Sequence, residues 1–157
     1  MVYKKILAAL DPDGEGTPPV FEHALKLVQT HHARLMLLGC MDPRTQAEIE
    51  DRIGTVAELD SSSRMGSLKH QAETERSRCR AWLGGLAKQA EQNDVSVRTT
   101  VDVGNPGQRI TELAQNWKAD LIVIGLTRRG PVADRLLGSV TSYVVHHAPC
   151  SVLLIHG

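Results

Sequence analysis

The sequence predicts a single α/β domain of the doubly wound, Rossmann-like class, with a five-stranded, mostly parallel sheet and helices on both faces. Three observations predict it. Short apolar runs recur along the chain, helical apolar patterns lie between them, and 157 residues suit one hydrophobic core. Strands that alternate with helices indicate parallel βαβ units, and strands buried on both faces read as nearly unbroken apolar runs.

Four of the expected strands are apolar runs of this kind. They are KKILAALD (residues 4–11), ARLMLLGC (33–40), LIVIG (121–125) and SVLLI (151–155). The fifth lies in VSVRTTVDVG, where Val95, Val97, Thr99, Val101 and Val103 alternate with polar residues. A period of two is typical of a half-exposed strand, which we expect at a sheet edge.

The first expected helix has Thr17 as its N-cap and Pro18 at the first helical position. Its core-facing residues are Val20, Ala24, Leu27 and Val28. The second helix spans residues 67–92, with Leu68, Ala72, Cys79, Trp82, Leu83, Leu86 and Ala90 near helical spacing. Its adjacent glycines, Gly84 and Gly85, predict a weak point or a close packing contact.

Two shorter helices complete the pattern. NPGQRITELAQNWKAD (105–120) predicts a helix with Ile110, Leu113, Ala114 and Trp117 inward, and residues 139–147 predict one with Val140, Tyr143 and Val144 inward. The segment 41–67 has no clear period and is longer than an ordinary loop. It is mobile, partly helical, or a lid over a site.

Charge and cysteine content limit the possible functions. Eighteen Lys plus Arg balance eighteen Asp plus Glu, which argues against a nucleic-acid-binding protein. The apolar run near the N-terminus is too short for a signal peptide or a membrane span. Three cysteines without a CxxC motif indicate reduced thiols, so we expect a cytoplasmic protein without membrane attachment.

Ligands of doubly wound sheets bind beyond the carboxyl ends of the strands, where the strand order reverses. Two phosphate motifs fail there. Gly125 and Gly130 have the spacing of the P-loop glycines, but Pro131 and Val132 stand where Lys and Ser or Thr are required. In the loop after the first strand, Pro19 stands where the dinucleotide fingerprint requires its third glycine. No lysine or catalytic constellation accompanies these loops, so we expect no enzyme beyond slow ATP hydrolysis.

The remaining candidate is GLTRRGPVADRLLGSVTSYV, which follows LIVIG. Gly138, Ser139, Val140 and Thr141 open the last helix, where free N–H groups and the helix dipole favour an anion. Ser139 and Thr141 add hydroxyl donors, and arginines of the loop add positive charge. For an isolated helix, Gly138-Ser139 would be only an N-cap, and Asp11 would cap the first helix or bond Thr17.

These residues resemble the universal stress protein family. The loop is similar to its nucleotide pattern G-x2-G-x9-G-[S/T], and YKKILAALD, VGNP, ADLIVIG and LLGSVTSYVVHHAPCSVLLI extend the resemblance along residues 1–157. In the ATP-binding branch, the resemblance places Asp11 and Leu10 near adenosine and Cys40 against adenine. It places Ile124 and Gly125 at the ribose, and Gly138, Ser139, Val140 and Thr141 at the phosphates, with Mg²⁺ accompanying ATP.

The resemblance also implies a homodimer formed through the last strand, by Ser151, Val152, Leu153, Leu154 and Ile155. The loop departs from the family at one position, because Arg128 stands where the second glycine falls. An arginine there either blocks the turn or directs its guanidinium to a phosphate, and Gly130, two positions later, is the residue that could restore the flexibility. We expect an ATP-binding sensor or signalling module; the alternative is a nucleotide-independent dimeric interaction domain.

Overall fold

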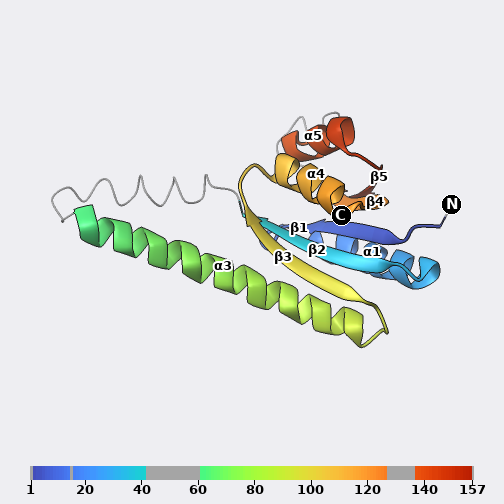
Figure 1. Cartoon of the computed structure of the whole chain (residues 1–157), viewed down its shortest axis with the longest axis horizontal. Helices are drawn as coiled ribbons and strands as arrows, with labels where there is room; N and C mark the ends of the chain where they lie inside the picture. The colour runs from blue at the N-terminus through green and yellow to red at the C-terminus, as the bar shows by residue number, and fades with distance from the viewer. Residues whose placement is uncertain (1, 15, 42–60, 127–136, 157) are drawn as a thin grey trace.

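Five parallel strands with helices on both sides form the chain, in a computed structural model that describes residues 2–14, 16–41, 61–126 and 137–156 (Figure 1). The order is β1 (Lys5–Leu10), α1 (Thr17–His31), β2 (Arg34–Met41), α3 (Ser61–Glu91), β3 (Val97–Val103), α4 (Pro106–Trp117), β4 (Leu121–Leu126), α5 (Ser139–His147) and β5 (Ser151–His156). The alternation of strands and helices confirms the expected class.

The strand order is β3-β2-β1-β4-β5, and all four neighbouring pairs are parallel. The central strand β1 is the most deeply buried, and its residues Ile6, Leu7 and Ala8 are 0% exposed. The alternating strand β3 lies at one edge, as its period of two predicts. Strand β5 lies at the other edge.

Two apolar clusters fill the space between the sheet and its helices. The first packs side chains of α1 and α3 on one face, and the second packs α4 and α5 on the other (Figure 1). Residues of one strand alternate between the clusters: Leu35 and Leu37 of β2 join the first, and Met36 and Leu38 the second. This alternation explains why the strand sequences are apolar at nearly every position.

The start of α1 differs from the sequence prediction. The N-cap is Gly16, and Thr17 is the first helical residue. The Thr17 hydroxyl hydrogen-bonds the backbone of Asp11 at the end of β1, and so it is not available to cap the helix. The apolar face is confirmed for Val20, Ala24 and Val28, which are buried, while Leu27 is half-buried against the same cluster.

Helix α3 is longer than expected. It begins at Ser61, so residues 61–67, expected to belong to the long segment, are helical, while residues 42–60 lie outside the described part. Figure 1 shows its first turns projecting past the sheet. The close packing contact expected at Gly84 and Gly85 was wrong, because a Cβ at either would meet nothing within 4 Å. The helix continues through both glycines, and the weak point expected there stays a prediction.

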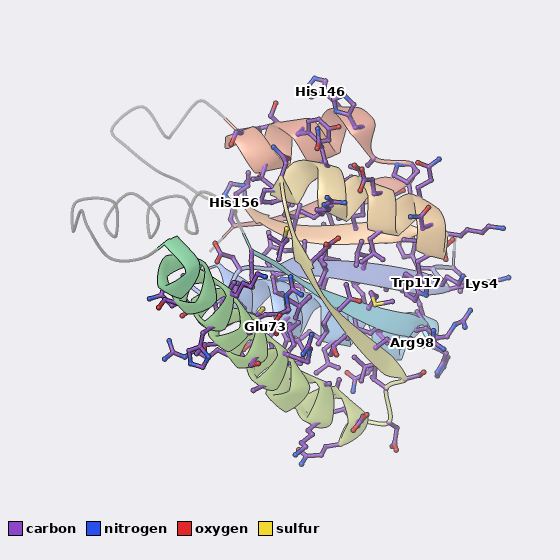
Figure 2. The ribbon with its side chains drawn as sticks, turned by 60° about the vertical axis from the view of Figure 1, so that its left-hand side comes forward. Lys4, Glu73, Arg98, Trp117, His146 and His156 are labelled. Atoms are coloured by element: carbon purple, nitrogen blue, oxygen red, sulfur yellow. The ribbon has the colours of Figure 1, made fainter. Side chains whose placement is uncertain are left out.

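The amino ends of β1 and β4 are joined by one carboxylate. Asp120 Oδ2 accepts hydrogen bonds from the backbone N–H groups of Lys4 (2.7 Å) and Lys5 (2.8 Å). The Lys5 ammonium donates to the Trp117 carbonyl oxygen at 2.8 Å and lies 5.5 Å from the centroid of the Trp117 ring. Figure 2 shows Lys4 and Trp117 at this end of the molecule and His156 at the opposite end.

Candidate functional site

The topology places the ends of β1 and β4 at the point where the chain changes direction. From β1 the chain moves outward to β2 and β3, and then returns to the other side of β1 to form β4 and β5. The connections that leave β1 and β4 therefore diverge at their carboxyl ends. This is the position where open α/β sheets bind ligands.

The loop that follows β1 is organised by Asp11. Its carboxylate oxygen Oδ1 accepts a hydrogen bond from the Asp13 N–H at 3.0 Å, and its carbonyl accepts one from the Gly14 N–H at 3.0 Å. The Thr17 hydroxyl bonds both backbone groups of Asp11. Asp11 is exposed, whereas Leu10 just before it is buried. The bond between Asp11 and Thr17 is the simpler alternative that the sequence allowed. It is formed through the Asp11 backbone and leaves the carboxylate exposed.

The carboxyl end of β4 lies against the start of α1. A Cβ built at Gly125 would lie 3.2 Å from Val20 Cγ2 and 3.8 Å from the Gly16 carbonyl oxygen. The absence of a side chain at Gly125 therefore allows the first turn of α1 to approach β4. Ile124, the preceding residue, is buried and faces the second cluster. The loop after β1 and the end of β4 thus meet at one place.

Helix α5 starts beside the same end of β4. The buried Thr141 hydroxyl donates to the Gly125 carbonyl oxygen at 3.5 Å, which holds the first turn of α5 next to β4. The N-cap is Gly138, which has no side chain to bond the first N–H groups. Ser139 is exposed and Val140 half-buried, so the first turn presents backbone N–H groups and one hydroxyl to an anion.

Cys40 lies near the end of β2, one strand from Asp11. Its thiol is half-buried and lies 3.9 Å from the Gly104 carbonyl oxygen, within the longer reach of a sulfur hydrogen bond. Cys40 is in register with Asp102 of β3, whose carboxylate lies 3.9 Å from Arg109 Nε. Arg109 also pairs with Glu112 at 3.1 Å. Charged groups therefore line the β2–β3 side of this edge.

The structure thus brings together most of the expected nucleotide-binding residues. Leu10, Asp11, Cys40, Ile124, Gly125, Gly138, Ser139, Val140 and Thr141 all lie at or next to the carboxyl ends of β1, β2 and β4. Arg128 and Gly130, also expected there, lie outside the described residues. The expected strand of the dimer, Ser151 to Ile155, is an edge strand, with Val152, Leu153 and Leu154 half-buried.

Sequence reasoning missed one residue of this edge, because Arg109 was not singled out. The bond between Thr17 and Asp11 was foreseen only as the simpler alternative to the nucleotide-binding role of Asp11. The Arg109–Glu112 pair could have been found from its spacing of three residues on a helix. The Arg109–Asp102 contact joins a strand to the following helix and has no comparable signal in the sequence.

The loop after β1 changes the pKa of a thiol on α3, that of Cys79. Burial raises the pKa of the Cys79 thiol, and the carboxylates of Asp11 and Asp13 raise it further. A Cβ atom built at Gly39 would lie only 2.6 Å from the Sγ atom of Cys79. Helix α3 therefore packs tightly on β2 just before Cys40, within electrostatic reach of the loop after β1.

No group of three or more His, Cys, Asp or Glu side chains in the described residues is placed to hold a metal ion. No helix among them is long and apolar enough to cross a bilayer.

Comparisons with known proteins identify relatives along the whole chain. A model described as the universal stress protein family matches residues 2–156. A universal stress protein of Synechocystis is 35% identical over 156 residues, which is 99% of both chains. The solved structure of the universal stress protein UspA from Lactobacillus plantarum has a TM-score of 0.75 and 25% identity, and 99% of each chain is covered.

Two further solved structures share the fold and contain nucleotides. A universal stress protein in complex with cAMP has a TM-score of 0.69 and 20% identity, over 99% of this chain and 98% of that chain. A universal stress protein from Archaeoglobus fulgidus in complex with dAMP has a TM-score of 0.59 and 16% identity, over 99% of each chain. At these identities the likeness shows the fold alone.

Proposed function

We propose that this chain, which belongs to the universal stress protein family, binds an adenine nucleotide, with ATP as its ligand, and serves as a sensor or signalling module in a stress response. The observation that carries the proposal is the position of α5. Its N-terminus has a glycine N-cap and is attached by Thr141 to Gly125, at the switch point of the sheet.

The chemistry of this end suits a phosphate group. The first N–H groups of a helix have no partner within the helix, and the helix dipole adds partial positive charge. Gly138, Ser139 and Val140 would bind the phosphates, with Ile124 and Gly125 at the ribose. Asp11, at the end of β1, and Cys40, on β2 beyond it, would lie at the adenosine. The cAMP and dAMP complexes of fold neighbours support the choice of an adenine nucleotide.

Among the described residues, the side chains that could hold Mg²⁺ are too few to bind it without ATP. Because no three-ligand group lies among those residues, the phosphates would supply most of the ligands of the ion. Asp11 is an exposed carboxylate at this edge, as is Asp13, and a contact through water is the role that Asp11 would have.

The direct test is calorimetric titration of ATP and Mg²⁺ into protein that has been stripped of nucleotide. We expect micromolar binding, and competition by AMP and cAMP would rank the nucleotides. Gly138→Val is expected to abolish binding, because its side chain would occupy the space in front of the first turn of α5. Gly85→Ala is the matched control, since a Cβ there meets nothing within 4 Å. No heat with the parent protein, or unchanged affinity in Gly138→Val, would contradict the proposal.

Arg128 separates this proposal from a nucleotide-independent interaction domain. If the Arg128 guanidinium binds a phosphate of ATP, Arg128→Gly should weaken ATP binding, because that contact is removed. If the arginine blocks the loop, the parent protein should not bind ATP and Arg128→Gly should gain binding. The second result would favour a protein that acts only through its partners.

We also propose that two copies pair through β5. The strand is apolar and lies at an edge, and a bare apolar edge promotes uncontrolled association unless it is covered. Sedimentation should show a dimer, and Val152→Lys should give a monomer. Thr99→Lys, on the opposite edge strand β3, should remain dimeric. A monomeric parent protein would contradict this pairing.

A further inference from the structure

We infer that Gly107 and Tyr143 are positioning residues for the nucleotide phosphates, because the contact between them sets where the N-terminus of α5 lies. The inference rests on the proposed function and concerns residues that do not themselves meet the ligand. It makes the α4–α5 interface a determinant of the affinity for the phosphate part of ATP.

The contact is too close for any side chain at Gly107. A Cβ built there would lie 2.8 Å from Tyr143 Cδ1, 3.0 Å from Tyr143 Cγ and 3.0 Å from Tyr143 Cβ. Gly107 is buried in the first turn of α4, and Tyr143 is on α5 one turn after Ser139. The two helices therefore touch near the ends that start at the carboxyl edge of the sheet.

The Tyr143 ring is held by a stacking contact within α5. The His147 ring stacks on the Tyr143 ring, with centroids 4.0 Å apart and an angle of 14° between the planes. His147 is itself held, because its Nδ1 atom lies 2.8 Å from the Tyr143 carbonyl oxygen. The Tyr143 Cβ atom is fixed by the backbone in any case. A larger residue at position 107 would therefore displace α5 as a whole.

A movement of α5 would displace the backbone N–H groups that form the proposed phosphate site. The helix has nine residues and packs on α4 and β4, so it has few other supports. The hydrogen bond from Thr141 to the Gly125 carbonyl, already 3.5 Å long, links the first turn of α5 to β4. A shift would lengthen it and turn the N–H groups of Ser139 and Val140 away from their common target.

Gly107→Ala tests the inference. ATP and adenosine are titrated in parallel, because adenosine lacks the group that the α5 N-terminus would bind. We expect ATP affinity to fall about tenfold or more, which corresponds to the loss of one hydrogen bond to a charged group. Adenosine affinity should stay within about twofold of the parent value. Val28→Ala, a buried change near the far end of α1, should lower stability without altering the ratio of the two affinities.

A double variant separates positioning from general damage. In Gly107→Ala/Tyr143→Ala the two ring atoms that crowd the new methyl group are gone and only the 3.0 Å contact with the Cβ atom of residue 143 remains, so the ratio of ATP to adenosine affinity should recover in part toward the parent value. A ratio in Gly107→Ala equal to that of the parent protein would overturn the inference and leave the proposed function intact. Equal losses for both ligands, or no recovery in the double variant, would also overturn it. A parent protein that binds no ATP would overturn both.

Discussion

The Thr17 hydroxyl and the Asp11 backbone form a reciprocal pair of hydrogen bonds. Thr17 Oγ1 accepts from the Asp11 N–H at 3.2 Å and donates to the Asp11 carbonyl oxygen. Thr17 is the first residue of α1 and is buried, and Asp11 follows the last residue of β1. One side chain therefore closes the loop between the central strand and its helix, directly beside the proposed adenosine position.

Thr17→Val should destabilise the fold, because valine has nearly the same shape but leaves the Asp11 N–H without its partner. We expect the free energy of unfolding to fall by about 1–3 kcal/mol, the usual cost of an unsatisfied buried donor. Urea denaturation measures this loss. Thr17→Ser keeps the hydroxyl and serves as the control, which should lie within about 1 kcal/mol of the parent protein. Equal stability of the two variants would show that the hydroxyl pair contributes nothing.

The Thr141→Val variant tests whether the buried hydroxyl contributes to stability or to ATP affinity. Its bond to the Gly125 carbonyl is long, so we expect a loss of less than about 1 kcal/mol in stability. ATP affinity should remain near that of the parent protein if backbone N–H groups hold the phosphates. A large loss of ATP affinity at unchanged stability would instead assign the hydroxyl to a phosphate oxygen. Calorimetry on protein of verified stability separates the two results.

The sequence predicted the parts of the fold that depend on one segment at a time. Strands β1, β2, β4 and β5 are apolar because both sheet faces are covered, and the bounds of α5 agree with its predicted span. The start of α3 was missed because its first turns project beyond the sheet and carry no core-facing period. Apolar periodicity marks a helix only where the helix is packed.

The positions of the described candidate residues were predicted, but most of the contacts among them were not. The family resemblance and the topology together place Asp11, Gly125 and Ser139 at one edge of the sheet. The bonds that fix this edge join residues from different elements, as Thr141 does with Gly125. Thr17 shows the limit most clearly, because N-cap preference is a local rule and a tertiary partner at Asp11 overrode it.

Asp120→Ala should weaken the fold without affecting the ligand. The change removes one acceptor shared by the Lys4 and Lys5 N–H groups at the amino end of the sheet. Because the carboxylate is exposed, water can replace part of the loss, and we expect about 1 kcal/mol. Asp120→Asn keeps an oxygen acceptor and should lose less. ATP affinity should not change in either variant, and a parallel loss would mean that the two ends of the sheet are coupled.

Alkaline pH should destabilise the protein through its buried thiols. Burial raises the pKa of Cys79, as do the nearby Asp11 and Asp13 carboxylates, and burial together with Asp120 raises the pKa of Cys150. In the unfolded chain these thiols ionise near their ordinary pKa of about 8.5, before the folded protein releases the same protons. Stability is therefore complete below that pH and falls as the pH rises toward the folded values.

Urea denaturation at a series of pH values from about 7 to about 10 measures this decline. Cys79→Ala should make it shallower, and Cys79→Ala/Cys150→Ala should remove the part due to these two thiols. The Asp11→Asn variant tests the electrostatic part, because it removes a negative charge near Cys79 and leaves the burial of the thiol unchanged. Its decline should begin at the same pH, which the unfolded chain sets, but should be smaller and end at lower pH, since the folded pKa of Cys79 falls toward the ordinary value. The same pH dependence in the parent protein and in the double cysteine variant would show that other groups control stability in alkali.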